Sequence, residues 1–127
     1  MGPGAPVHIC RPERIRVTGE AILTEGALKS AVISFFLGCG VIGVAGVSTF
    51  TEDFGERLRE DFPELRRVTI AYDNDWRQKR EVRKALFRLQ GTLRRAGLRW
   101  SVRKWPDAWK GYDDYLAATA ERREVVA

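Results

Sequence analysis

The side chains in this sequence best suited to chemistry are three carboxylates, Glu25, Asp73 and Asp75. Asp73 and Asp75 flank Asn74 at the end of one strand-like segment, and Glu25 ends another. Clustered carboxylates repel one another and stay ionised only when a cation lies between them, and hard oxygen ligands suit Mg²⁺ or Mn²⁺ that bridges to phosphates. We therefore predict a site for Mg²⁺ (or Mn²⁺) that serves chemistry on nucleic-acid phosphates.

Each of these acids also has another interpretation. Asp and Asn are favoured at helix N-caps and in turns, so the D-N-D segment taken alone is better explained as a cap or a turn. Glu25 is either a further metal ligand or a general acid or base that serves the attacking or leaving oxygen. The argument for a site therefore depends on the order of the motifs along the chain.

Strand and helix patterns alternate along the sequence. Strand-like apolar runs are predicted at residues 15–18, 21–24, 41–45, 68–72 and 98–105. Helices are predicted at residues 27–37 and 51–62, along the stretch between Asp75 and Gly97, and from near Asp113. This alternation predicts an α/β fold with a central, mostly parallel sheet of about four strands and helices on both faces.

Such a fold brings the acids together. In open parallel sheets, ligands bind beyond the carboxyl ends of the strands. Glu25, Asp73 and Asp75 follow strands directly, and Asp113 follows the last strand after a loop. We expect these four acids at one edge of the sheet.

Composition limits the classes of protein. The 127 residues suffice for one domain, and the net charge of +5 favours polyanionic partners. Cys10 and Cys39 are the only cysteines, and His8 is the only histidine. This composition excludes a disulfide framework, a Cys- or His-ligated zinc centre and a histidine-dependent triad within the chain, and it favours a reducing, cytoplasmic location.

Residues 1–12 are rich in Gly and Pro and are predicted to be a flexible tail or linker, with a single domain at residues 13–127. Residues 31–50 carry no formal charge and are long enough to raise the question of a membrane span. Four glycines interrupt the stretch, and a helix followed by a buried strand explains the same apolarity. We therefore predict no membrane association.

The order of motifs resembles that of the Toprim domain, the catalytic fold shared by topoisomerases, bacterial primases and several nucleases. Residues 24–26 (T-E-G) are similar to its Glu-Gly motif, residues 46–49 (G-V-S-T) to its glycine turn, and residues 72–75 (Y-D-N-D) to its D-x-D strand. Residues 110–116 (K-G-Y-D-D-Y-L) are similar to the K-D-P-D-E-Y-L segment of bacterial primases. The match covers about residues 21–117 and is closer still to uncharacterised Toprim-like domains in primase and helicase proteins of plasmids and phages.

The resemblance implies roles for individual residues. Glu25 would be the general acid or base and would also reach the metal, Asp73 and Asp75 would bind it, and Asp113 would be a supplementary acid. Lys29 stands where many family members carry an aspartate, so its ammonium would replace a metal's charge or contact phosphate, and we include it among the catalytic candidates. Gly111 stands where primases carry another acid, which puts a second metal in doubt.

Basic and aromatic residues around these motifs are candidates for contact with nucleic acid. The phosphate-contacting candidates are Lys29, Arg77, Lys79, Arg80 and Lys110. A solvated helix face is the alternative explanation for the basic residues that follow Asp75. Trp76 and Trp109 are candidate stacking platforms, with core filling as the alternative.

Taken together, the sequence predicts a metal-dependent Toprim-like domain that acts on DNA or RNA by phosphodiester transfer or hydrolysis. We expect a nucleotidyl transferase or nuclease domain, associated with a primase in the replication of a mobile element and dependent on further domains or proteins. The alternative is a non-catalytic module that binds nucleic acid or nucleotide. A dehalogenase-like phosphatase is disfavoured, because that chemistry expects D-x-D on the first strand.

Overall fold

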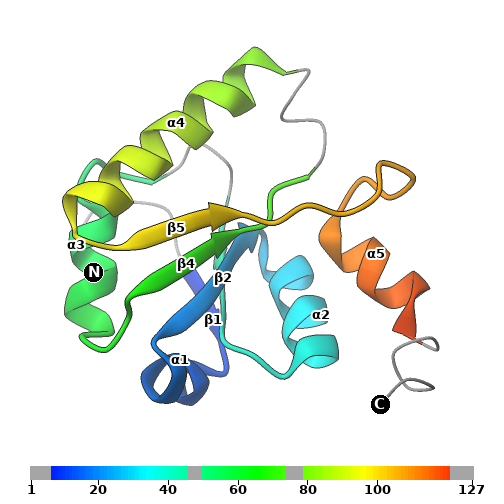
Figure 1. Ribbon diagram of the computed structural model, residues 1–127, viewed down its shortest axis with the longest axis horizontal. Coiled ribbons are helices and arrows are strands. Elements are labelled where there is room, and N and C mark those ends of the chain that lie inside the picture. Colours follow the sequence, from blue (N-terminus) through cyan, green and yellow to red (C-terminus); the bar gives the residue numbers. More distant parts are fainter. Residues whose placement is uncertain (1–6, 46–49, 74–78, 121–127) are drawn as a thin grey trace.

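Five strands form one sheet with the order β1-β3-β2-β4-β5 (Figure 1). The computed structural model describes residues 7–45, 50–73 and 79–120. The strands are β1 (Val7–Cys10), β2 (Glu20–Glu25), β3 (Val41–Val44), β4 (Arg67–Ile70) and β5 (Arg99–Val102). The helices are α1 (Pro12–Thr18), α2 (Ala27–Leu37), α3 (Phe54–Asp61), α4 (Arg80–Arg95) and α5 (Tyr112–Ala118). Strands β2 to β5 pair in parallel, and β1 runs antiparallel to β3. The predicted mostly parallel α/β fold is confirmed.

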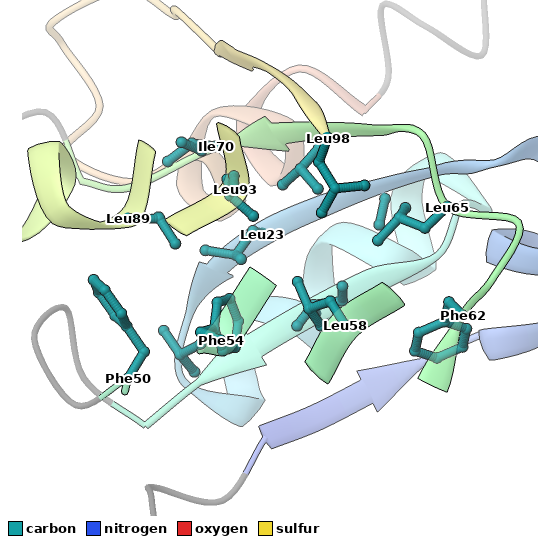
Figure 2. Close-up of a cluster of buried hydrophobic side chains, with 14 of the residues drawn as sticks. Leu23, Phe50, Phe54, Leu58, Phe62, Leu65, Ile70, Leu89, Leu93 and Leu98 are labelled. Carbon is teal, nitrogen blue, oxygen red and sulfur yellow. The ribbon is translucent and has the colours of Figure 1, made fainter. Parts of the chain in front are cut away.

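One face of the sheet packs against α3 and α4. Leu23 of β2 and Ile70 of β4 point to this side and are fully buried beside Leu58, Leu89 and Leu93 (Figure 2). The cluster is large for a chain of this size, so burial of apolar surface here supplies most of the driving force for folding.

The opposite face packs against α2 and α5. Because side chains alternate along a strand, Ile22 points here while its neighbour Leu23 points to the other side. Ile33 of α2 and Leu116 of α5 are buried in this second cluster, and Trp105 lies with them. Core filling is therefore the role of Trp105. The two clusters explain why β2 and β3 read as continuous apolar runs.

The strand predicted at residues 15–18 is wrong, since α1 occupies this stretch. Pro12 begins the helix, where its missing N–H costs nothing, and Gly19 ends it at a φ of 72°. In a strand, Ile15 and Val17 would share a face. In the helix Ile15 is fully buried while Val17 is 75% exposed.

The tail predicted at residues 1–12 is wrong for its second half. Val7–Cys10 form β1, which pairs with β3 from Val7↔Val44 to Cys10↔Val41. This strand is short and its side chains are exposed or half-buried, so it lacks the apolar alternation that marks a strand in a sequence. The sheet accordingly has five strands rather than about four.

The remaining elements lie close to their predicted positions. The helix at residues 27–37 matches α2, while α3 begins three residues later than predicted and β5 is shorter than the run at 98–105. Among the described residues, no helix is both long and apolar enough to span a membrane.

Candidate functional site

The carboxyl ends of β2 and β4 lie side by side and present the predicted acids at one edge. Leu23 pairs with Ile70, and the N–H of Ala71 donates to the carbonyl of Leu23 at 2.8 Å. Glu25 then ends β2, and Asp73 comes three residues after β4 ends. The sheet therefore delivers Glu25 and Asp73 to the same edge, as predicted.

Two glycines set the start of α2 against this edge. Gly26 adopts a φ of 86°, which favours glycine, and its N–H donates to the carbonyl of Val44 at 2.6 Å. At Gly43 a Cβ would lie 2.8 Å from the Gly26 carbonyl oxygen and 2.8 Å from the Ser30 hydroxyl. Glycine at position 43 therefore allows the first turn of α2 to pack directly on β3, which positions Lys29.

Lys29 of α2 binds Asp73 through both carboxylate oxygens. Its Nζ donates to Oδ1 at 2.6 Å and to Oδ2 at 2.7 Å, with side-chain exposures of 32% for Lys29 and 19% for Asp73. Burial acts to lower the pKa of Lys29. The hydrogen bond to Asp73 and the charges of Asp73, Asp113 and Glu25 outweigh it, so the pKa is raised. Lys29 thus places a positive charge close to the carboxylates of Asp73, Asp113 and Glu25.

Asp113 enters the site from the first turn of α5. Its Oδ1 is buried and has no hydrogen-bond partner among the described residues. Burial, then the charge of Asp114, raises the pKa of Asp113, against the opposing charge of Lys29. A Cβ at Gly111 would lie 2.4 Å from Asp113 Oδ1 and 3.2 Å from Asp73 Oδ1. Both carboxylates therefore lie next to Gly111, and any side chain at position 111 would collide with that of Asp113.

Tyr72 is a buried residue near Glu25 that the sequence reasoning did not single out. It is 3% exposed, and its hydroxyl has no hydrogen-bond partner among the described residues. Burial, with the nearby charge of Glu25 second, raises the pKa of Tyr72. A tyrosine in an apolar segment is usually interpreted as a core residue. The one sequence feature that relates Tyr72 to the predicted site is that it directly precedes Asp73.

The described side chains do not complete a metal centre by themselves. Within residues 7–45, 50–73 and 79–120, no three His, Cys, Asp or Glu side chains group closely enough to hold a metal ion. Asp75 lies outside these residues, as do Arg77, Trp76 and the predicted glycine turn at 46–49. The metal prediction therefore stays a prediction.

The other predicted phosphate contacts lie around the same edge. Lys110 is exposed and directly precedes Gly111. Lys79 and Arg80 are exposed at the start of α4, which lies on the side of the sheet toward which the arrowheads of β4 and β5 point (Figure 1). Trp109 is half-buried beside Tyr115, at a ring-centroid distance of 5.4 Å, which favours a packing role.

Comparison with known families gives one match. Residues 16–123 match the family described as a domain of unknown function, DUF3854. The chain belongs to the DUF3854 family. No curated protein matches this DUF3854 domain.

Three solved structures similar to the DUF3854 domain come from primases or contain primase domains. The Aquifex aeolicus primase, in its zinc-binding and RNA polymerase domains, has a TM-score of 0.70 at 20% identity, covering 98% of this chain and 29% of that one. The primase fragment of the bacteriophage T7 primase-helicase has a TM-score of 0.57 at 16% identity, covering 84% and 42%. A structure of the T7 lagging-strand DNA polymerase with primase domains bound to an RNA/DNA hybrid has a TM-score of 0.54 at 16% identity. The match covers 83% of this chain and 51% of that one. The DUF3854 domain thus shares their fold and spans about half or less of their length.

Proposed function

We propose that this DUF3854 domain is a Toprim-like domain that acts on nucleic-acid phosphates in a metal-dependent way, in association with a primase in cytoplasmic DNA replication. The observation that carries the proposal is the convergence of Asp73, Asp113 and Lys29 at the carboxyl edge, beside Glu25. Fold similarity to two primases supports the choice of nucleic acid over other phosphates. Further domains or proteins would complete the activity.

The chemistry of these side chains suits Mg²⁺ or Mn²⁺, and Asp75 would have to complete the site, because the described acids alone do not group closely enough to hold an ion. Asp73 and Asp113 offer hard carboxylate oxygens, and Asp113 Oδ1 is buried without a partner among the described residues. Glu25, Asp73, Asp75 and Asp113 would hold the ion. The ion would neutralise charge on a phosphoryl group and orient it. Lys29, once released from Asp73, would contact the phosphate, and Glu25 would move a proton at the attacking or leaving oxygen.

One observation favours a second function, a module that binds nucleic acid or nucleotide without turnover. Lys29 engages both oxygens of Asp73 and so supplies the positive charge that the carboxylate needs. In that case Lys29 and the exposed Lys110 would hold phosphate by charge alone.

Metal binding is tested by titrating the ¹⁵N-labelled protein with Mg²⁺ and following its backbone amides. We expect shifts at Gly26 and Asp73 that disappear in Asp73→Asn. Asp53→Asn, which removes an exposed acid at the N-cap of α3, should leave them intact. Amides at the edge that do not respond to Mg²⁺ would eliminate the metal site.

Turnover separates the two functions. The protein is incubated with labelled single-stranded DNA, RNA and nucleoside triphosphates in Mn²⁺, alone and with a partner primase domain. Product that requires Glu25, and is lost in Glu25→Gln, supports the enzyme. Binding with no Glu25-dependent product supports the module.

A further inference from the structure

The outer face of α4 combines one exposed aromatic ring with several cations. The inner face of the helix is buried against the sheet through Ala85, Leu86, Leu89, Thr92 and Leu93. Helical spacing places Arg80, Arg83, Lys84 and Phe87 together on the opposite face, at i, i+3, i+4 and i+7. Phe87 is 77% exposed. We call these four residues, with Gly91, the Phe87 surface.

The ring of Phe87 borders two open hollows. One, of about 520 Å³, is lined by Arg80, Arg83, Lys84, Phe87 and Arg88. The other, of about 280 Å³, lies between α4 and the segment at Phe50 and includes Gly91 and Arg95. The guanidinium of Arg88 lies 5.2 Å from the centroid of the Phe50 ring, which holds it at the wall between them. Open space therefore adjoins Phe87 in two places.

Gly91 lies one turn after Phe87, and packing does not require it to be glycine. A Cβ there would meet a single group, the Nη1 of Arg95 at 3.3 Å, which is the end of a flexible side chain. Alanine would fit and would stabilise the helix, because glycine is a poor helix former. What glycine provides here is open space beside an exposed ring.

The charge around Phe87 selects the kind of partner. The other exposed phenylalanine on a helix is Phe35 of α2, which is 73% exposed. It lies near apolar neighbours: the ring of Phe36 at a centroid distance of 5.2 Å, and the exposed Leu28 two turns earlier. Phe87 instead is surrounded mainly by cations, with Glu52 as the acid that lines the second hollow. An interface with another protein would require a larger apolar patch than one ring provides. Single-stranded nucleic acid can stack a base on the ring and place its phosphates beside the cations.

We propose that the Phe87 surface binds single-stranded nucleic acid. One base stacks on the Phe87 ring in the space left by Gly91, and Arg83 and Lys84 contact the adjacent phosphates. Because α4 begins at the carboxyl edge of the sheet, the strand would lead toward Asp73 and Lys29 (Figure 1). The inference deepens the proposed function and rests on it for the choice of nucleic acid, but it needs no metal.

Binding is measured by fluorescence anisotropy of labelled 12-nucleotide strands in EDTA, so that failure of the metal site does not affect the result. Phe87→Ala should weaken binding about ten-fold, as expected for the loss of one base stack. Phe35→Ala, which removes an equally exposed ring, should change nothing. The proposal would be overturned if the two variants had equal effects, or if the unaltered protein bound neither a DNA nor an RNA strand. Either result would favour a protein partner for this face.

Two further measurements identify the stacked base. Gly91→Ala should raise the melting temperature and still weaken strand binding, a combination that a purely structural role would not give. An abasic strand should bind Phe87→Ala and the unaltered protein equally, whereas sensitivity of abasic binding to Phe87 would refute stacking. Parallel use of DNA and RNA strands identifies which one binds more tightly, and a duplex should bind less well than either.

The phosphate contacts are tested by salt dependence. Lys84→Gln should lower the slope of log affinity against log salt by about 0.7, the value for one lost contact to a single strand. Arg14→Gln, an exposed cation on α1, should leave the slope unchanged. An unchanged slope in Lys84→Gln would remove Lys84 from the interface.

Discussion

Gly55 of α3 lies directly against the backbone of Thr92 in α4. A Cβ on Gly55 would come within 2.2 Å of the Thr92 carbonyl oxygen. The N–H of Gly55 donates to the Thr92 hydroxyl at 3.0 Å, and that hydroxyl donates to the carbonyl of Glu52 at 2.7 Å. One threonine side chain thereby joins the start of α3 to α4, and the two helices approach as closely as a glycine allows.

Gly55→Ala should lower the free energy of unfolding by about 3 kcal/mol, because the backbone of α4 cannot yield as a side chain would. Urea denaturation measures the change. Gly91→Ala on α4 is the matched control and should raise stability by about 0.5–1 kcal/mol. Loss of stability in both variants would show that the two glycines share a role in helix packing.

Tyr72→Phe should leave the fold intact and raise the free energy of unfolding by about 1 kcal/mol. The tyrosine hydroxyl is buried and has no hydrogen-bond partner among the described residues. Folding therefore removes it from water without replacing the lost hydrogen bonds, and phenylalanine avoids this cost. Thermal and urea unfolding test this. A destabilised Tyr72→Phe would mean that the hydroxyl has a partner in solution. A stable variant with weaker Mg²⁺ binding would show that the hydroxyl serves the site.

Lys29→Met should tighten Mn²⁺ binding about five-fold, since the ammonium competes for both oxygens of Asp73 in an ion pair worth about 1 kcal/mol. Isothermal titration calorimetry gives the affinity. Lys110→Met removes the same charge next to Gly111 and should have a smaller effect. Weaker Mn²⁺ binding in Lys29→Met would contradict competition and would indicate that Lys29 holds Asp73 in place for the ion.

Cys39 gives the stability a pH dependence. Burial raises the pKa of its thiol, against the smaller effect of nearby arginines. Its contribution is therefore fully present below the unfolded pKa of about 8.5 and is lost as pH rises through the higher folded pKa. The free energy of unfolding should fall as the pH rises above about 8.5 under reducing conditions. Cys39→Ala should remove this part of the decline, and Cys10→Ala should keep it.

Most of the sheet could be predicted because β2 and β3 are buried on both faces and β4 on one, which produces apolar runs followed by glycine or acid. The errors fell at α1 and β1, where burial is slight. A single buried side chain, Ile15, anchors α1, so a strand and a helix predict nearly the same pattern there. In β1, backbone pairing with β3 holds the strand in place, and backbone pairing leaves no mark on side-chain type.

The sequence was sufficient to predict which edge of the sheet carries the site, but not the contacts within it. Parallel strands bring their ends together, so Glu25 and Asp73 could be placed from strand order alone. Their partners depend on distances between helices. The contact of Lys29 with Asp73 requires Gly43, which no motif identified, and the position of Asp113 beside Gly111 requires α5 to pack on α2.

The antiparallel strand β1 covers one side of the sheet by binding the free backbone groups of β3. Without it, the edge strand on this side would be β3, whose four residues are all buried, instead of β1, whose residues are exposed or half-buried, and an apolar edge strand invites pairing between molecules. A version of this protein trimmed to begin at Glu13, where the Gly- and Pro-rich segment suggests a natural cut, would therefore be prone to self-association. Four residues that contribute little to the core thus separate the apolar strand β3 from the edge of the sheet.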